Sequence, residues 1–412
     1  MTIYSYSAWI ITFAAVISYL NYRFIRLPAT VAIMAASLLI SFLLLVMGSI
    51  KLPGLLEEIK ILVAEAHFSE LVMNFMLGLL LFAGGLTIDL SQLNKQKLEI
   101  TLLTIISTVM SAFLVALLTY YIINLVGGHL AFIDCLLFGS LISPTDPIAV
   151  LAIFKKLGAS KHMKTIVSAE SLFNDGVGVV LFITVYKLAF LNEPSTFSNV
   201  TGLLLREAGG GILYGLILGW LIRKLLTTVH DHKVEILLTL AAVLGGYTLA
   251  QYLMISGPLA MVVLGIYVAN TNQKVINREQ SELRHFWELI EELLNAILFL
   301  LLGFEMLAIN FDSVSVIVAF CLIPIVLLIR FATVALPIIL LKPWRLHTPY
   351  TISILTWGGL RGALAIALAL AIPNPLIQQP ILLFTYVIVA FSILIQGTTI
   401  VYFVKSANKI IH

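Results

Sequence analysis

Five ionisable side chains interrupt the long apolar stretches of this chain. The acids are Asp146, Glu170 and Asp175, and the bases are Arg330 and Arg361. Each would cost at least ~2.5 kcal/mol at the centre of a bilayer, so such groups normally pair or line an ion pathway. Because arginine stays protonated, two of the three acids can be compensated and one cannot. The spare carboxylate must hold a mobile cation or a proton, which is the minimum requirement for exchanging the two.

The stretch "SAESLFNDGVGVV" offers the spare acid. Ser171, Asn174 and Asp175 are spaced i, i+3 and i+4, so they share one helical face. Their hydroxyl, amide and carboxylate oxygens are hard ligands that suit Na⁺ or Li⁺. Glu170 lies about 100° away around the helix and is predicted to face an arginine. We therefore predict Asp175 as the uncompensated group, and a mainly structural ion-pair role for Glu170, Arg330 and Arg361.

The stretch "LISPTDPIAV" places two helix breakers beside an acid. Pro144 and Pro147 have no N–H, so the carbonyls four residues before them lose their helical partners. The residues before the prolines, Ser143 and Asp146, are pushed out of the helical region. We expect an extended break over 143–147. Inside a membrane such backbone is tolerated only in protein or along a cavity, where it would supply carbonyl ligands beside Asp146.

Composition decides which environment surrounds these residues. The chain has 412 residues, 60% hydrophobic and 11% charged, against roughly 25% charged in a soluble domain. It is therefore a polytopic membrane protein. The net charge of +3 is small and gives no reason to expect a nucleic-acid partner.

Apolar stretches of the roughly 20 residues that a bilayer requires follow one another along the chain. We predict thirteen transmembrane helices, at 5–22, 27–48, 68–88, 98–126, 130–154, 165–190, 203–227, 234–254, 256–270, 288–309, 313–341, 350–373 and 378–404.

The positive-inside rule supports this count. The connections after helices 1, 3, 5, 7, 9 and 11 and the C-terminal tail carry 18 Lys and Arg, whereas the N-terminus and the other connections carry only Lys51 and Lys60. We expect a multi-pass protein of the plasma membrane with its N-terminus outside and its C-terminus in the cytoplasm.

A second helix break is expected in the stretch "TWGGLRGALAIALAL". Gly358, Gly359 and Gly362 surround Arg361 in predicted helix 12. Helix 5 is the fifth of helices 1–6 and helix 12 the fifth of helices 8–13, and the two sets begin on opposite sides. The predicted fold is thus an all-α membrane protein with inverted six-helix repeats and two discontinuous helices that cross.

The motifs resemble one family. "SPTDPIAV", "ESLFNDGVGVV" with its aspartate 29 residues beyond the first, and "GGLRGALAIALAL" are similar to the monovalent cation:proton antiporter family 1. That family includes NhaP-type sodium/proton antiporters and animal sodium/proton exchangers. "SGPLAMVVLGIYVAN" and "FWELIEELLNAILFLLLGFE" also match, so the resemblance covers essentially the whole chain.

The resemblance implies a homodimer with a core domain and an interface domain. Carried onto this chain, the divisions are an interface part at 1–97, a core part at 98–190, a linker helix at 191–233, a second interface part at 234–309 and a second core part at 310–412.

The resemblance also implies where the ion binds. Na⁺ would sit against Asp175, and the site would be completed by Asn174, Ser171, Thr145 and Asp146. Glu170 would pair with Arg330 or Arg361, a choice that the resemblance leaves open. An Asn-Asp pair resembles the electroneutral branch, which exchanges one Na⁺ per H⁺.

The expected function is exchange of Na⁺ (or Li⁺) for H⁺ by alternating access, with no cofactor. K⁺/H⁺ exchange by the same ligands is the main alternative. A cation channel is a remote one, since it needs no inverted broken helices. A membrane enzyme is disfavoured because the eight histidines have no metal-ligand spacing.

Overall fold

The computed structural model describes residues 3–50, 68–191, 193–194, 196–229, 231–270, 273–341 and 350–411. Every named element in these residues is a helix, and the extended backbone forms a single isolated bridge between Asp146 and Leu360. Lys51 and Lys60, which entered the prediction of sidedness, lie outside the described residues.

The N-terminal half contains α1 Ile3–Leu20, α2 Ala29–Ile50, α4 Phe68–Leu71, α5 Leu77–Leu86, α6 Leu90–Thr101, α7 Ser107–Leu125, α8 Phe132–Ile142, α9 Ile148–Leu157 and α10 Lys161–Phe190. The remainder contains α11 Phe197–Leu204, α12 Gly210–Leu226, α13 His232–Tyr252, α14 Gly257–Ala269, α15 Gln273–Phe304, α16 Ser313–Leu341, α17 Thr351–Trp357, α18 Ala363–Leu370, α19 Pro375–Phe391 and α20 Gly397–Ile411.

Several neighbouring helices run into one another without leaving the helical path. Single wider turns join α4 to α5, α6 to α7, α11 to α12 and α19 to α20. A helix that continues in this way needs no polar loop inside the membrane, because its backbone groups stay bonded within the segment.

Nine helices in the described residues are long and apolar enough to cross a membrane. The other predicted spans coincide with α8–α9, α14, α15 and α17–α18, which are broken, short or rich in charge. The chain is therefore an all-helical, multi-pass membrane protein, and the count of thirteen spans stays a prediction.

Some helices begin before the predicted spans. The fourth span was predicted from residue 98, yet its helix starts at Leu90 because Asp89 accepts the N–H of Ser91 at 2.7 Å and caps it. Its first turns are polar ("LSQLNKQK"), so hydropathy does not detect them. The short link between the eighth and ninth spans was predicted correctly, since α13 ends at Tyr252 and α14 begins at Gly257.

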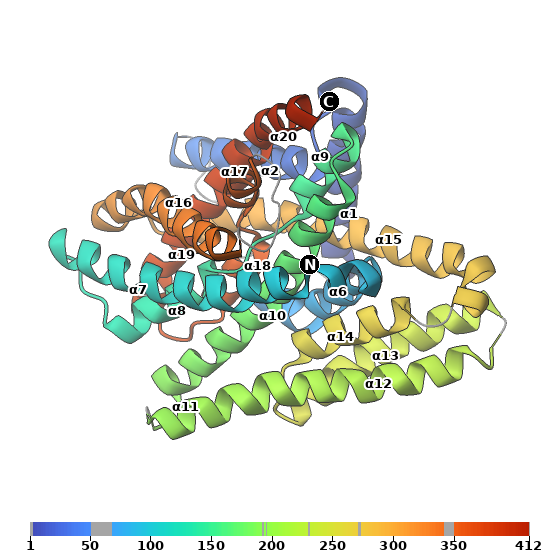
Figure 1. Cartoon of the computed structure of the whole chain (residues 1–412). Coiled ribbons are helices and arrows are strands. Elements are labelled where there is room, and N and C mark those ends of the chain that lie inside the picture. The colour runs from blue at the N-terminus through green and yellow to red at the C-terminus, as the bar shows by residue number, and fades with distance from the viewer. Residues whose placement is uncertain are drawn as a thin grey trace.

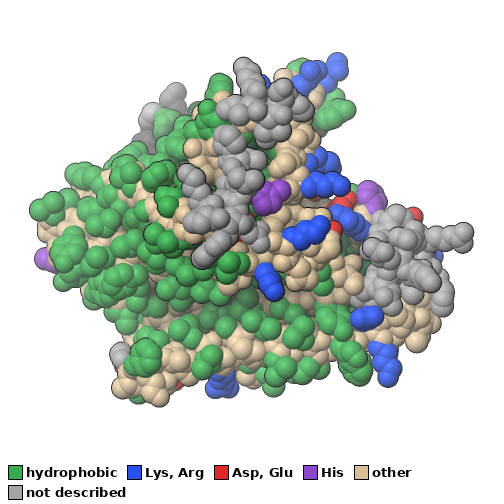
Figure 2. All heavy atoms as spheres, viewed as in Figure 1, with side chains coloured by type: hydrophobic (Ala, Val, Ile, Leu, Met, Phe, Trp, Pro, Cys, Tyr) green, Lys and Arg blue, Asp and Glu red, His purple; other side chains and the backbone are tan. Residues whose placement is uncertain are grey.

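Figure 1 shows one bundle, with α12 and α13 along one side and α16 and α19 on the opposite side of α7, α8 and α10. In Figure 2 hydrophobic side chains cover much of the visible face, whereas most visible Lys and Arg gather towards one end. Exposed large apolar side chains on α12 and α16, such as Trp220, Leu328 and Phe331, suit contact with lipid tails rather than water.

Two segments in the middle of the bundle are not helical. The chain leaves the helix between Ile142 and Ile148, the segment that contains both prolines, and again between Trp357 and Ala363, the segment that contains three glycines. These breaks position the residues of the candidate site.

Candidate cation-binding site

The two breaks lie against each other at the centre of the protein. The N–H of Asp146 donates to the carbonyl of Leu360 at 2.7 Å, which forms the isolated bridge. Gly362 permits this approach, because a Cβ there would lie 2.6 Å from Asp146 Oδ2. Each break thus satisfies part of the other's exposed backbone, as buried polar groups require.

Asp146 is held at the start of α9. Its Oδ1 accepts the N–H of Ile148, the first residue of that helix, at 2.9 Å. An acid in this position satisfies an orphan donor and interacts favourably with the helix dipole. One carboxylate oxygen of Asp146 therefore has a structural role, and the side chain also lines a cavity.

Arg361 binds backbone carbonyls, and it pairs with no acid among the described residues. Its Nη1 donates to the carbonyls of Ser143 and Pro144, the latter at 2.9 Å. The Ser143 carbonyl is one of those that the prolines leave without a helical partner. We expected the carbonyls of this break to supply cation ligands, but these two are already bound by the guanidinium.

Glu170 pairs with Arg330, which answers the question that the sequence left open. Arg330 Nη1 and Nη2 donate to the two carboxylate oxygens, both at 2.9 Å. Both residues are buried, with 2% and 4% of their surface exposed. Gly359 lets the second break pass this close, since a Cβ there would lie 2.6 Å from Arg330 Nε. The bidentate pair is the strong form of this interaction.

Asn174 connects the ion pair to the first break. Its Nδ2 donates to Glu170 Oε1 and to Thr145 Oγ1, both at 2.8 Å, and its Oδ1 accepts the N–H of Thr145 at 3.1 Å. A carboxylate can only accept, which fixes the orientation of the amide. Asn174 is fully buried, so most of its hydrogen-bonding capacity serves this junction.

Ser171 belongs to the same junction, since its Oγ lies 3.1 Å from Thr145 Oγ1. We predicted that Ser171, Asn174 and Asp175 act as one ligand face. In the structure the first two turn towards the break, and Gly178 makes room there: a Cβ on it would lie 2.1 Å from Pro144 Cγ. Ser171 and Asn174 could therefore coordinate an ion only through the lone pairs of their oxygens that these hydrogen bonds leave free.

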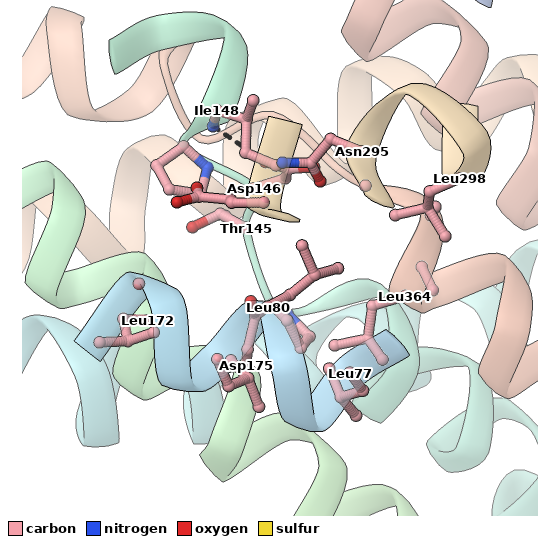
Figure 3. Close-up of a pocket in the computed structure, with 18 of the residues that line it drawn as sticks. Leu77, Leu80, Thr145, Asp146, Ile148, Leu172, Asp175, Asn295, Leu298 and Leu364 are labelled. Atoms are coloured by element: carbon pink, nitrogen blue, oxygen red, sulfur yellow. Dashed lines mark hydrogen bonds between the residues drawn. The ribbon is translucent and has the colours of Figure 1, made fainter. Parts of the chain in front are cut away.

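Asp175 has different surroundings from the other two predicted acids. It makes no hydrogen bond or ion pair with any residue that the structure describes. Its side chain lines a cavity of about 150 Å³, which is also lined by Thr145 and Asp146. Figure 3 shows Asp175 on one side of this cavity beside Leu77 and Leu80, with Thr145 and Asp146 on the other side.

The cavity is also lined by polar residues that the sequence analysis did not single out. Glu291 and Asn295 line it from α15, and Ser168 lines it from α10. The signal was present in the sequence, because Glu291 and Asn295 are spaced i, i+4 and so share a helical face. The stretch that contains them carries one of the motifs that resemble the family.

The charges around the cavity all have one sign. Among its described lining residues are the acids Asp146, Asp175 and Glu291, and none of these lining residues is Lys, Arg or His. The rest of the wall is mainly apolar, from α5, α15 and α18. A cleft of one sign with low-dielectric walls concentrates ions of the opposite sign, so this cavity favours cations.

Two interrupted helices that meet around buried acids, within an all-helical membrane protein, define a secondary transporter of the discontinuous-helix class. Comparison with known proteins identifies which family. The sequence matches the sodium/hydrogen exchanger transmembrane family over residues 11–406. The chain therefore belongs to the sodium/hydrogen exchanger family. The family members that are similar to this chain are transporters and not enzymes.

Relatives cover nearly the whole chain. The Na⁺/H⁺ antiporter NhaP of Pseudomonas aeruginosa is 41% identical over 396 residues, which is 95% of this chain and 93% of that protein. The Na⁺/H⁺ antiporter NhaH of Halobacillus aidingensis is 31% identical over 368 residues, 86% and 88% of the two chains. The solved sodium proton antiporter MjNhaP1 of Methanocaldococcus jannaschii at pH 8 has the same fold, with a TM-score of 0.77, 18% identity and 98% of both chains covered.

Proposed function

We propose that this protein exchanges Na⁺ (or Li⁺) for H⁺ across the plasma membrane, and that Asp175 holds the two ions alternately. One observation carries the proposal: Asp175 is the predicted acid that lines the cavity without a partner among the described residues. The names of the similar proteins, Na⁺/H⁺ antiporters, support the same pair of ions.

The charge balance around Asp175 supports this role. Arg330 is used by Glu170, and Arg361 is used by backbone carbonyls, so neither guanidinium bonds to Asp175. An uncompensated carboxylate in such a place is expensive, and either Na⁺ or a proton would neutralise it. Because both need the same group, binding of one excludes the other, which couples their movements.

We propose alternating access by movement of the core against the interface domain. The cavity is lined from α8, the first break and α10 of the predicted core, and from α5 and α15 of the predicted interface domain. A site at the border of two bodies can open to either side when they shift. The empty, charged site would resist passage, which prevents leak.

The proposal extends to the assembly and to the stoichiometry. We propose a homodimer, inverted repeats with crossing broken helices, a C-terminus in the cytoplasm, and an exchange of one Na⁺ per H⁺. The stoichiometry of one Na⁺ per H⁺ is inferred from Asn174. This residue is neutral and engaged in hydrogen bonds, so it adds no second titrating charge beside Asp175.

The test is fluorescence dequenching in proteoliposomes with Na⁺, Li⁺ and K⁺ in turn, with and without an imposed membrane potential. Na⁺ or Li⁺ should move protons at a rate that the potential does not change. Asp175→Asn should abolish this signal and leave a protein that elutes and melts like the parent. Retained exchange in Asp175→Asn would refute the role of Asp175.

Other results would select the alternatives. A response to K⁺ alone would indicate a K⁺/H⁺ antiporter. Conductance without coupled proton movement would indicate a channel. The elution profile of each protein is recorded before transport is measured. A failure of folding is therefore seen before it can be mistaken for a loss of transport.

A further inference from the structure

The α15 wall of the cavity is polar at two positions that the proposed exchange at Asp175 does not use. Glu291 and Asn295 both line the cavity, one helical turn apart. The residues between and beside them on α15 include Leu294, which is buried, and Glu292, which is exposed. The face of α15 towards the cavity therefore carries an acid and an amide. Glu292 and Leu294 do not line the cavity.

Asn295 is buried but not satisfied. Only 4% of its surface is exposed, and its Oδ1 has no hydrogen-bond partner among the residues that the structure describes. Figure 3 shows its side chain projecting from α15 into the cavity, on the side where Asp146 lies. A buried acceptor left unpaired costs roughly 1–3 kcal/mol, so its position favours a ligand that can be coordinated by oxygen.

Glu291 adds charge at the same wall. It is partly buried, and it lines the same cavity of about 150 Å³ as Asp146. Glu291 forms no ion pair with another described residue, although Arg284 on the same helix pairs with Glu288. Two acids that repel each other across a small space are stabilised by a cation between them.

The cavity has room for a cation that keeps water. Its volume of about 150 Å³ is roughly ten times the space that one water molecule needs. A monovalent cation could therefore be held by oxygens from α15 and from Asp146 while it is still partly hydrated, before it reaches Asp175.

We propose that Glu291, Asn295 and Asp146 form a second cation site, here named the α15 site, which binds a partly hydrated monovalent cation next to Asp175. The inference rests on the proposed exchange and specifies how its cation arrives. The α15 site sets the affinity for the cation, whereas Asp175 performs the exchange with the proton.

The test separates affinity from maximal rate. In proteoliposomes titrated with Na⁺, Glu291→Gln and Asn295→Leu should each raise the apparent KM for Na⁺ by roughly 3- to 10-fold, as expected from losing one nearby charge or ligand. The maximal rate should stay close to that of the parent. Glu292→Gln is the matched control, because Glu292 is an exposed acid on the same helix, and its KM should not change.

Asn295→Asp tests the sign of the effect. An added carboxylate in the α15 site should lower the apparent KM for Na⁺, a result that a merely structural role of Asn295 would not produce. If Asn295→Leu fails to fold, Asn295→Asp still tests the α15 site, since Asp is close to Asn in shape.

An unchanged KM in Glu291→Gln, or a fall in maximal rate with KM unchanged, would overturn the α15 site. The same would follow if Glu292→Gln shifted KM as much as Glu291→Gln. Failure of the proposed function is distinguishable, because then the parent protein itself would show no Na⁺-driven proton movement.

Discussion

Glu170 and Asp175 lie five residues apart on α10, and their side chains have opposite surroundings. Glu170 is engaged by a bidentate arginine and by Asn174, whereas Asp175 faces the cavity without a partner in the described residues. The junction of Glu170, Asn174 and Thr145 thus holds the first break beside α10, and Asp175 is not part of it.

Breaking the Glu170–Arg330 pair should harm the fold before it harms the chemistry. Glu170→Ala would leave the guanidinium of Arg330 buried and unpaired and would remove an acceptor of Asn174. The expected loss is about 3–5 kcal/mol of unfolding free energy, visible as a lower melting temperature in detergent.

The double variant Glu170→Ala/Arg330→Met is the control, because it removes both charges and should recover part of that loss. A single variant that melts like the parent but does not transport would contradict the structural role and would place Glu170 in the transport machinery.

At the scale of elements, the site depends on how closely α10 approaches the first break. Gly178 is the contact point: the missing Cβ would lie 2.1 Å from Pro144 Cγ. No side chain can occupy that space unless α10 or the break moves. The glycine therefore sets the separation between Asp175 on α10 and Asp146 in the break.

Gly178→Ala should lower transport by roughly 10- to 100-fold, because a displacement of about 1 Å at a site can have an effect of that size. The measurement is Na⁺-driven dequenching in proteoliposomes. Gly245→Ala is the matched control, since a Cβ there meets nothing within 4 Å and alanine favours the helix. Equal activity of the two variants would show that the close packing is not required.

At the scale of the whole molecule, the proposed coupling of the two ions depends on one shared group in one cavity. The cavity is lined from both the predicted core and the predicted interface domain. A single carboxylate that binds either ion makes the proton a competitive inhibitor of Na⁺.

Lowering the pH on the acid side of the activity profile should therefore raise the apparent KM for Na⁺ by about tenfold per pH unit, which is the linkage expected when one proton is displaced per cation. The maximal rate at saturating Na⁺ should be unchanged. Initial rates over a grid of pH and Na⁺ concentration measure this. A falling maximal rate at constant KM would instead require a separate protonation site.

Much of this molecule follows from local sequence. Runs of apolar residues determine the helices, because a bilayer gives the backbone no partners outside the segment. Pro144 and Pro147 determine the first break, because they lack the N–H that a helix needs. The cost of charge in an apolar stretch marks Asp146, Glu170, Asp175, Arg330 and Arg361 as residues that need partners or ligands.

Other features depend on how distant segments pack. Glu170 and its partner Arg330 are 160 residues apart, and Arg361 reaches carbonyls 217 and 218 residues away. Counting charges indicates that pairs must form but not between which helices. Glu291 and Asn295 line the cavity only because α15 packs against it in the folded protein. Partner choice and cavity walls depend on the three-dimensional arrangement of helices, and helical periodicity alone carries no information about which helices will touch.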